Sequence, residues 1–250
     1  MKRPKYVAFA TQKGGAGKTT ITVLVASHLH YTRELNIAII DCDFPQHSIC
    51  EMRHRDTELV KNDLFYKVLA YKQLERLQKR GYPVVEARFD TALAKAQELS
   101  EGGEFDFIFF DLPGTINASG ITDVIKGMDY IITPIIADRV VLESSLRFAT
   151  VVNDKLISTG ESAIKGLYML WNMVDRRERT ELYEIYEETI ESLGISIMTN
   201  HFPDSKRFRR EGSESHRPIF RSTLFPIDRT LVKGSNIVAV VDEFLELTKE

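Results

Sequence analysis

The sequence has few cysteines and no long apolar run, the features that mark disulfide-rich, membrane-spanning and secreted proteins. It contains only two cysteines in 250 residues, which is too few for a disulfide framework and fits a reducing compartment. No apolar run approaches the roughly 20 residues that a membrane-spanning helix needs. The apolar run near the N-terminus is too short for the core of a secretory signal. We therefore expect a cytoplasmic protein.

Charge of one sign is not in excess either. The formal net charge is -3, so a contact with nucleic acid would have to come from a local basic patch. The length allows one domain with a substantial core. No internal repeat or low-complexity linker divides the chain, and we expect residues 1–250 to form a single domain.

The sequence does contain a series of short, nearly continuous apolar runs, separated by stretches with helical patterning. Such runs are typical of strands buried on both faces. Their alternation with helices predicts a doubly wound α/β fold, in which helices flank a mostly parallel sheet. The predicted strands are 5–11, 36–43, 105–111, 129–136, 166–174 and 195–202, and the predicted helices are 18–31, 57–79, 88–100, 138–157, 178–193 and 235–248. Residues 53–100 are charged and are predicted to be a helical insertion.

A glycine-rich stretch, "ATQKGGAGKTT", spans Ala10 to Thr20. It follows a predicted strand and opens a predicted helix, a context in which backbone N–H groups converge on an anion. The pattern G-x-x-x-x-G-K-[ST] places Lys18 against the β- and γ-phosphates of a nucleotide and the Thr19 hydroxyl on Mg²⁺. A plain glycine turn is the alternative. The residues expected to hold the nucleotide are Gly14, Gly15, Ala16, Gly17, Lys18, Thr19 and Thr20.

The loop departs from the usual pattern, because Gln12 stands at the first glycine position and Lys13 follows it. This K-G-G-x-G-K-T-T form resembles the deviant Walker A motif of the ParA, MinD and Soj family of P-loop ATPases. The resemblance implies that Lys13 crosses a dimer interface and touches the nucleotide of the other subunit. It therefore also implies a homodimer that forms on ATP binding. The alternative is that Lys13 is a solvated loop lysine with no role at an interface.

Carboxylates follow two of the predicted strands. "DCDFPQHS" resembles the family's D-x-D-P-Q segment, with Phe44 inserted before Pro45. The resemblance assigns Asp43 to orienting the attacking water and Asp41 to the magnesium shell, whereas capping of the next helix is the alternative for both. "FDFIFFDLPG" is typical of a Walker B strand, whose Asp111 would hold Mg²⁺ through water.

Two later positions match the family's adenine site. Asn172, in "LWNMVDRR", stands where the family has an asparagine that reads the adenine edge, and a neutral amide can donate and accept at once. A turn asparagine is the alternative. Pro203, after Phe202, resembles the later loop that packs on adenine.

Three branches of the family differ in their partners. Nitrogenase iron protein needs cysteines that hold a cluster between subunits, but Cys42 and Cys50 flank the predicted magnesium segment and are expected to be small buried residues. MinD-like members end in a basic amphipathic helix, and the acidic ending "NIVAVVDEFLELTKE" disfavours membrane binding. We therefore expect this chain to resemble the ParA and Soj branch, whose members bind DNA without sequence preference.

A candidate DNA contact lies at 206–221, where six Lys or Arg stand against two Glu. Local basic clusters of this kind can contact phosphates, and a solvated helix face is the alternative. The predicted DNA-binding residues are Lys206, Arg207, Arg209 and Arg210.

The resemblance as a whole implies a ParA-like ATPase that binds Mg-ATP, dimerises around it and hydrolyses it slowly. Lys13, Lys18 and Asp43 would be its catalytic residues, and a protein partner would stimulate turnover. The switch would position or transfer DNA, in partition or conjugation. The alternatives are a protein-positioning switch without DNA binding, a dethiobiotin-synthetase-like ligase, and an adaptor that binds ATP without hydrolysing it.

Overall fold

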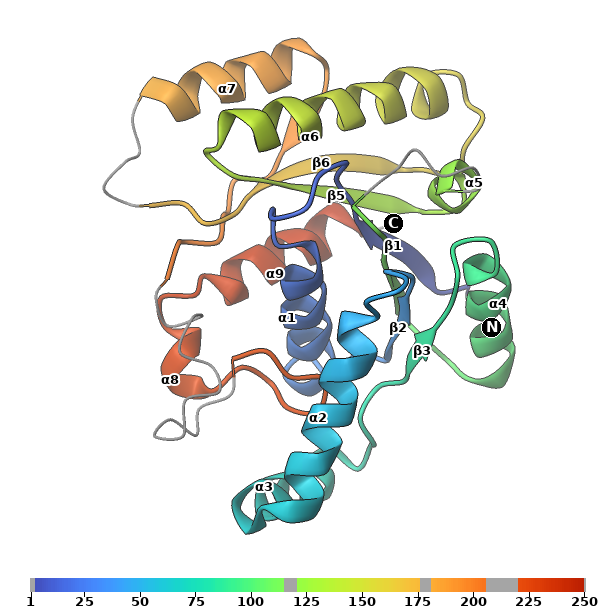
Figure 1. Ribbon diagram of the computed structural model, residues 1–250, viewed down its shortest axis with the longest axis vertical. Coiled ribbons are helices and arrows are strands. Elements are labelled where there is room, and N and C mark those ends of the chain that lie inside the picture. Colours follow the sequence, from blue (N-terminus) through green and yellow to red (C-terminus); the bar gives the residue numbers. More distant parts are fainter. Residues whose placement is uncertain (1–2, 115–120, 176–180, 206–219, 250) are drawn as a thin grey trace.

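The computed structural model describes residues 3–114, 121–175, 181–205 and 220–249. Within these ranges a seven-stranded sheet has the order β3-β2-β4-β1-β5-β6-β7, and its strand pairs are parallel (Figure 1). The predicted fold class is therefore confirmed. The strands are β1 Lys5–Phe9, β2 Ile37–Asp41, β3 Val84–Glu86, β4 Phe107–Asp111, β5 Tyr130–Ile135, β6 Gly166–Trp171 and β7 Ser196–Ile197.

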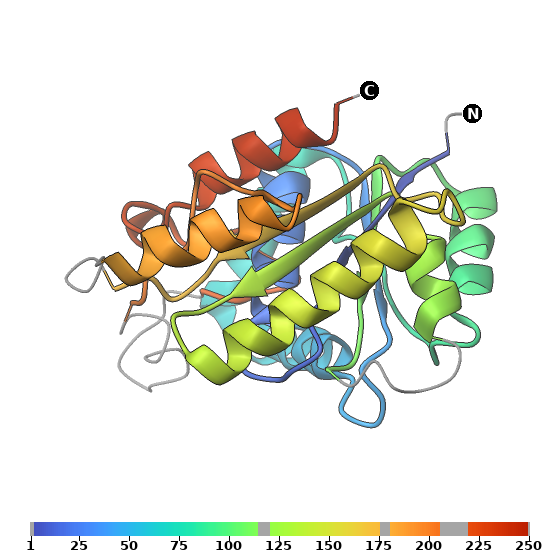
Figure 2. The same ribbon diagram turned by 90° about the horizontal axis from the view of Figure 1, so that it is seen from above.

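Helices cover both faces of the sheet (Figure 2). Alternate residues of β1 enter different cores: Val7 and Phe9 pack in one, and Tyr6 and Ala8 in the other. Because both faces are covered, the central strands are mostly apolar. The helices are α1 Lys18–Tyr31, α2 Ser48–Asn62, α3 Leu64–Leu77, α4 Ala92–Gly102, α5 Ile121–Lys126, α6 Arg139–Val152, α7 Glu181–Ser192, α8 Arg229–Val232 and α9 Ile237–Leu247, and the π-helix Asn153–Ile157 continues α6.

The helices differ in which core they cover. Buried residues of α1 and α9 pack in the core that contains Val7 and Phe9, while those of α4, α5, α6 and α7 pack in the other. In the part of the chain that the structure describes, no helix is both long and apolar enough to span a bilayer. Cys42 is buried as expected, but Cys50 on α2 is only half-buried.

The region 53–100 is mostly helical, as predicted, but it also contributes a strand. β3 pairs in parallel with β2 at the edge of the sheet, with Asp41 opposite Glu86. The region is therefore part of the central sheet as well as a helical addition. Three half-exposed residues are too short a segment to give a periodic signal.

The strand predicted at 195–202 is much shorter in the structure. Beyond β7 the N–H groups of Thr199 and Asn200 donate to the two carboxylate oxygens of Glu243 on α9, at 2.6 and 2.8 Å. A side chain distant in sequence thus interrupts the ladder, although the N–H groups of Met198 and Phe202 still donate to the Met169 and Trp171 carbonyls of β6.

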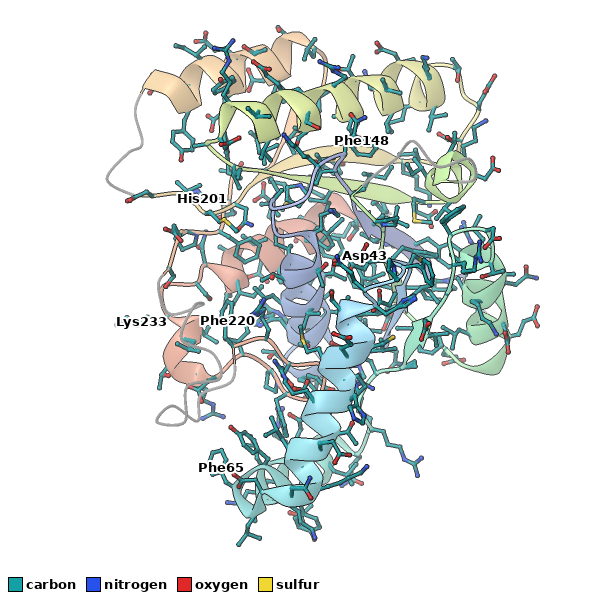
Figure 3. All side chains as sticks on the ribbon, in the orientation of Figure 1. Asp43, Phe65, Phe148, His201, Phe220 and Lys233 are labelled. Carbon is teal, nitrogen blue, oxygen red and sulfur yellow. The ribbon has the colours of Figure 1, made fainter. Side chains whose placement is uncertain are left out.

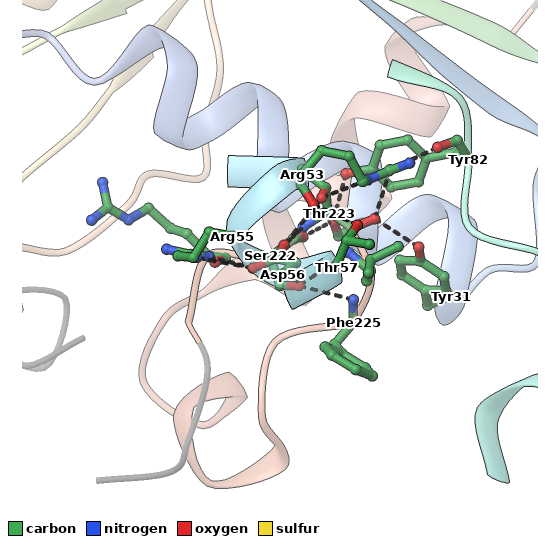
Figure 4. A network of polar contacts seen from close by, with 12 residues as sticks. Tyr31, Arg53, Arg55, Asp56, Thr57, Tyr82, Ser222, Thr223 and Phe225 are labelled. Atoms are coloured by element: carbon green, nitrogen blue, oxygen red, sulfur yellow. Dashed lines mark hydrogen bonds and ion pairs between the residues drawn. The ribbon is translucent and has the colours of Figure 1, made fainter. Parts of the chain in front are cut away.

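A buried polar network ties α2 to the segment 220–225 (Figure 4). Asp56 is fully buried, and its Oδ2 accepts hydrogen bonds from the Ser222 hydroxyl at 2.9 Å and the Thr223 N–H at 2.7 Å. Its Oδ1 accepts from the Arg55 guanidinium at 2.7 Å. Arg53 adds a bond from Nη2 to the Thr223 carbonyl at 3.0 Å. The carboxylate is thus buried with its hydrogen-bonding capacity satisfied.

We expect Asp56→Ala to lower the free energy of unfolding by about 3–5 kcal/mol, because it leaves buried donors without an acceptor. Denaturant titration followed by circular dichroism measures the change. The control is Asp242→Ala, which breaks an exposed ion pair with Arg33 and should cost less than about 1 kcal/mol. Equal effects of the two substitutions would contradict a special role for the buried network.

Candidate functional site

The glycine loop joins the end of β1 to the start of α1, and α1 begins at Lys18 as predicted. Gly17 has φ of 87°, a left-handed conformation that favours glycine. A Cβ at Gly17 would lie 2.4 Å from Nδ2 of Asn172. The loop is thus fixed by backbone conformation and by a neighbour, while Gly14 and Gly15 remain exposed. Exposed amides at a helix start suit phosphate binding.

The two lysines of the loop lie in different environments. Lys13 is exposed. Lys18 is partly buried, and burial lowers its pKa, whereas the nearby carboxylates of Asp111 and Asp43 raise it. Gly114 packs against the loop, because a Cβ there would lie 3.4 Å from the Lys18 Nζ. Lys18 therefore faces the interior of the site and Lys13 faces solvent.

Asp111 ends β4 beside the loop. Its Oδ2 accepts a hydrogen bond from the Thr19 hydroxyl at 2.8 Å. Its Oδ1 is buried and receives no hydrogen bond from the described residues. Burial raises the pKa of Asp111 to about 7, with further raising by Asp41, while the Thr19 hydroxyl and Lys18 lower it. A buried carboxylate oxygen without a donor fits a cation or its bound water.

Asp41 ends β2 directly opposite Asp111 in the sheet register. Its Oδ2 accepts from the N–H groups of Ile49 and Cys50, at 2.9 and 3.0 Å. Asp41 therefore caps α2, which is the alternative that the sequence left open. Its Oδ1 accepts from the Asp43 N–H at 3.3 Å and lies 3.8 Å from Nδ1 of His47.

Asp43 lies on the loop between β2 and α2, next to the start of α2 (Figure 3). It is half-buried, and no side-chain hydrogen bond to a described residue holds it. Burial raises its pKa, Lys18 lowers it, and Asp41 raises it further. The next residue, Phe44, is 63% exposed, and its ring packs against the edge of His47. The inserted phenylalanine therefore points to solvent and does not displace Asp43 from the site.

Asn172 and Pro203 come together at the end of β6. Asn172 is buried, and its Nδ2 donates to the Ala16 carbonyl at 2.8 Å, so its amide supports the glycine loop. Pro203 pairs with Val174 in an isolated bridge. Both residues thus lie at the carboxyl edge of the sheet, where ligands bind in open α/β folds.

One contact at the site was not predicted from the sequence. Nη1 of Arg221 donates to the Thr20 hydroxyl at 3.4 Å, on the first turn of α1. The two residues are about 200 positions apart in sequence, and no local pattern marks such a pair. The predicted DNA contacts Lys206, Arg207, Arg209 and Arg210 lie outside the described residues.

A loop suited to phosphates beside a carboxylate-lined sheet edge defines the class of P-loop nucleotide hydrolases. The family model described as ATPase MipZ matches residues 5–181, and the chain belongs to that family. It is thus an ATPase of the ParA and MinD group, as the loop motif predicted.

Similar proteins support the same fold. An uncharacterised protein of Borreliella burgdorferi, BBD21, is 26% identical over 211 residues, which cover 73% of this chain and 84% of that protein. A plasmid partition protein from Borrelia burgdorferi, solved with AMPPNP, has a TM-score of 0.64 at 16% identity, with 98% of this chain and 99% of that chain covered. The ParA of pNOB8, solved with nonspecific DNA, has a TM-score of 0.58 at 16% identity, with 98% of each chain covered.

The different environments of the two lysines give a direct test. Lys18→Ala should weaken ATP binding about 30-fold or more, because a buried ammonium facing the phosphates is lost. Lys13→Ala, five positions away in the same loop, is the matched control and should bind ATP as the parent does. Calorimetric titration with ATP and Mg²⁺ measures both. Unchanged affinity of the Lys18 variant would show that the loop does not hold the phosphates in this way.

Proposed function

We propose that this ATPase acts as a switch that dimerises around Mg-ATP and is reset by slow hydrolysis. The observation that carries the proposal is the placement of Lys13. Its side chain is exposed at the tip of the loop, beside the equally exposed Gly14 and Gly15, while Lys18 alone faces the interior. A lysine in this position is accessible to a nucleotide held by a second copy.

The residues at the sheet edge fit a magnesium ion. Asp111 and Thr19 would hold it, because the Thr19 hydroxyl and both Asp111 oxygens lie in one cluster and Oδ1 of Asp111 has no described donor. Asp41 would contribute through its Oδ1, since its Oδ2 is engaged by α2. When bound, the ion supplies positive charge that neutralises the phosphate oxygens.

Hydrolysis would then depend on three features of this chain. The loop amides and Lys18 offset negative charge on the β- and γ-phosphates. Asp43, free of hydrogen bonds to the described side chains, would orient the attacking water. Because its carboxylate is only half-buried, water can reach it. Gly114, packed on the loop, would respond to the γ-phosphate.

Substitutions at Asp43 and Lys13 separate binding, dimerisation and hydrolysis. Asp43→Ala should keep ATP bound and trap a dimer, because the phosphate cradle survives while the water loses its orienting group. Lys13→Ala should bind ATP but fail to dimerise and turn over. Light scattering with a slowly hydrolysed ATP analogue and a phosphate-release assay measure the two effects. If the Lys13 variant dimerised and hydrolysed ATP as the parent does, Lys13 would be only a solvated loop lysine.

Phosphate release distinguishes the switch from the ligase and from the non-enzymatic adaptor. A ligase of the dethiobiotin-synthetase type would release phosphate only with an acid substrate present, and an adaptor would release none. Phosphate release by the parent chain with ATP and Mg²⁺ alone therefore favours the switch over both.

We further propose that the switch positions or transfers DNA, in partition or conjugation. Support comes from the basic cluster at 206–210 in the sequence, and from the likeness of the fold to the pNOB8 ParA that was solved with nonspecific DNA. The plasmid partition protein of Borrelia is a second neighbour with a related biological setting. A protein partner would stimulate ATP turnover. If the chain does not bind DNA, the alternative is that the same switch positions proteins.

Random-sequence duplex DNA tests this part of the proposal. Binding should need ATP, because a dimer presents the patch twice, and should weaken steeply with salt, with about 0.9 added to the log–log slope for each phosphate neutralised. Reversing Arg209 and Arg210 to Glu should remove binding. Reversing Lys95 on α4 and Lys155 on the π-helix to Glu gives the same change of charge and should leave DNA binding intact. No binding by the parent at low salt with ATP would defeat the DNA hypothesis.

A further inference from the structure

Helix α3 presents an apolar outer face to solvent. Thirteen large apolar side chains are exposed in the described chain, and six of them lie on this one helix. Leu64 is 75% exposed and Tyr71 61%, and the other four are Phe65, Val68, Leu69 and Leu74. Isolated apolar residues on a surface are common, but a contiguous cluster of this size marks an interaction surface.

The inner side of α3 is firmly held. Tyr66 is buried, with its ring 6.2 Å from that of Phe225. Gln73 donates to the Leu224 carbonyl at 2.7 Å, and Arg76 to the Tyr31 carbonyl at 2.9 Å. Because these contacts fix the helix, the outer face cannot be buried by rotating α3 onto the body of the protein.

The outer face has a specific distribution of charge. An open hollow of about 520 Å³ is lined by Asp63, Leu64, Phe65, Val68, Leu69 and Lys72. A carboxylate thus stands at one end, an ammonium at the other, and apolar side chains between them. From Asp63 to Lys72 the helix rises about 14 Å, at about 1.5 Å per residue. Val68 lies near the middle of this span.

We propose that this face is a two-fold interface with a second copy of the same chain, and that it forms without nucleotide. An axis through Val68 would lay two α3 helices antiparallel, so that Asp63 of each copy meets Lys72 of the other. Two opposite-charge contacts would then flank a shared apolar centre. Two-fold interfaces are self-complementary in this way, and they are the commonest in homo-oligomers.

The charges favour a second copy over the other occupants of an apolar face. A partner segment with charge of one sign would match only one end of the hollow. Anionic lipid would meet the carboxylate of Asp63 at one end of the hollow. Contact along one helix lies at the small end of specific interfaces, so we expect a dissociation constant on the order of 10–100 µM.

The surface is separate from the nucleotide site. Asp43 and Phe65 lie near opposite ends of α2 (Figure 3), and none of the residues lining the hollow belongs to the glycine loop or the sheet edge. The inference therefore does not rest on the proposed switch, and it is tested with nucleotide-free protein.

A residue on a two-fold axis meets its own copy, and this gives a sharp experiment at Val68. Val68→Glu and Val68→Lys should each be monomeric, because like charges meet at the centre. Mixed in equal amounts, the two variants should form a heterodimer, because opposite charges then meet. Sedimentation velocity over a concentration series, without nucleotide, distinguishes these species. Val68 is half-exposed, so its substitution should leave the circular dichroism spectrum unchanged.

The matched controls are Val140→Glu and Val140→Lys, at an exposed apolar position on α6, and both should dimerise as the parent does. A parent chain that stays monomeric at about tenfold above the expected dissociation constant would overturn the proposal. So would dimers of either Val68 variant alone, or two monomeric variants that fail to associate when mixed. Binding of the monomeric parent to anionic vesicles, lost in Val68→Glu, would assign the face to lipid instead.

Discussion

The balance between one partly buried ammonium and the carboxylates at the same sheet edge organises the site. Lys18 loses hydration, which disfavours its charge, and Asp111 and Asp43 compensate. Asp111 in turn is buried enough for its pKa to reach about 7. Such a site has one place for an anion, at the loop and Lys18, and one for a cation, at Oδ1 of Asp111. The proposed ligand, Mg-ATP, carries a negative and a positive charge together and would therefore match both places.

Asp41 connects that edge to the rest of the molecule. Its carboxylate holds the first turn of α2. Arg53, one turn further along α2, and Asp56, two turns further, hold Thr223. Arg221, two residues before Thr223, contacts Thr20 at the start of α1. The segment 220–225 is therefore joined to the nucleotide site from both sides. The two carboxylates that anchor these links, Asp41 and Asp56, are fully buried and hydrogen-bonded, so the segment is tied to α2 by buried polar groups.

The parts of the fold and site that depend on local pattern could be predicted from the sequence. The bounds of α1, the central strands and the loop that precedes Lys18 follow from apolar runs and glycine spacing. The sequence also placed Asp41 and Asp111 at one edge, because the carboxyl ends of parallel strands meet there, and the family resemblance added Asn172 and Pro203. What each side chain bonds to could not be predicted in this way.

The features that were missed depend on contacts between distant segments. β3 is three residues long and exists as a strand because β2 offers it an edge. The ladder of β7 is interrupted where Glu243 takes the amides of Thr199 and Asn200. One helix was predicted over 57–79, whereas the structure has two, because α2 ends at Asn62 and α3 begins at Leu64. Which side of α3 would be covered could not be predicted, since that depends on Tyr31, Leu224 and Phe225. Burial of one side of a short helix is a tertiary property, and here it leaves the more apolar side outside.

The two proposed interfaces lie at different places on the chain, so both could form at the same time. They would also respond to different conditions. The proposed contact through Lys13 would require nucleotide and bring charged groups together, whereas the proposed α3 contact would be mainly apolar and would need no ligand. Two distinct two-fold axes in one chain generate assemblies larger than a dimer. A pair already joined through α3 would present two nucleotide sites on one particle, and each ATP-dependent contact would raise the effective concentration for the next. A weak α3 contact would therefore have little effect on a dilute monomer, but it would sharpen the response to ATP once dimers begin to form.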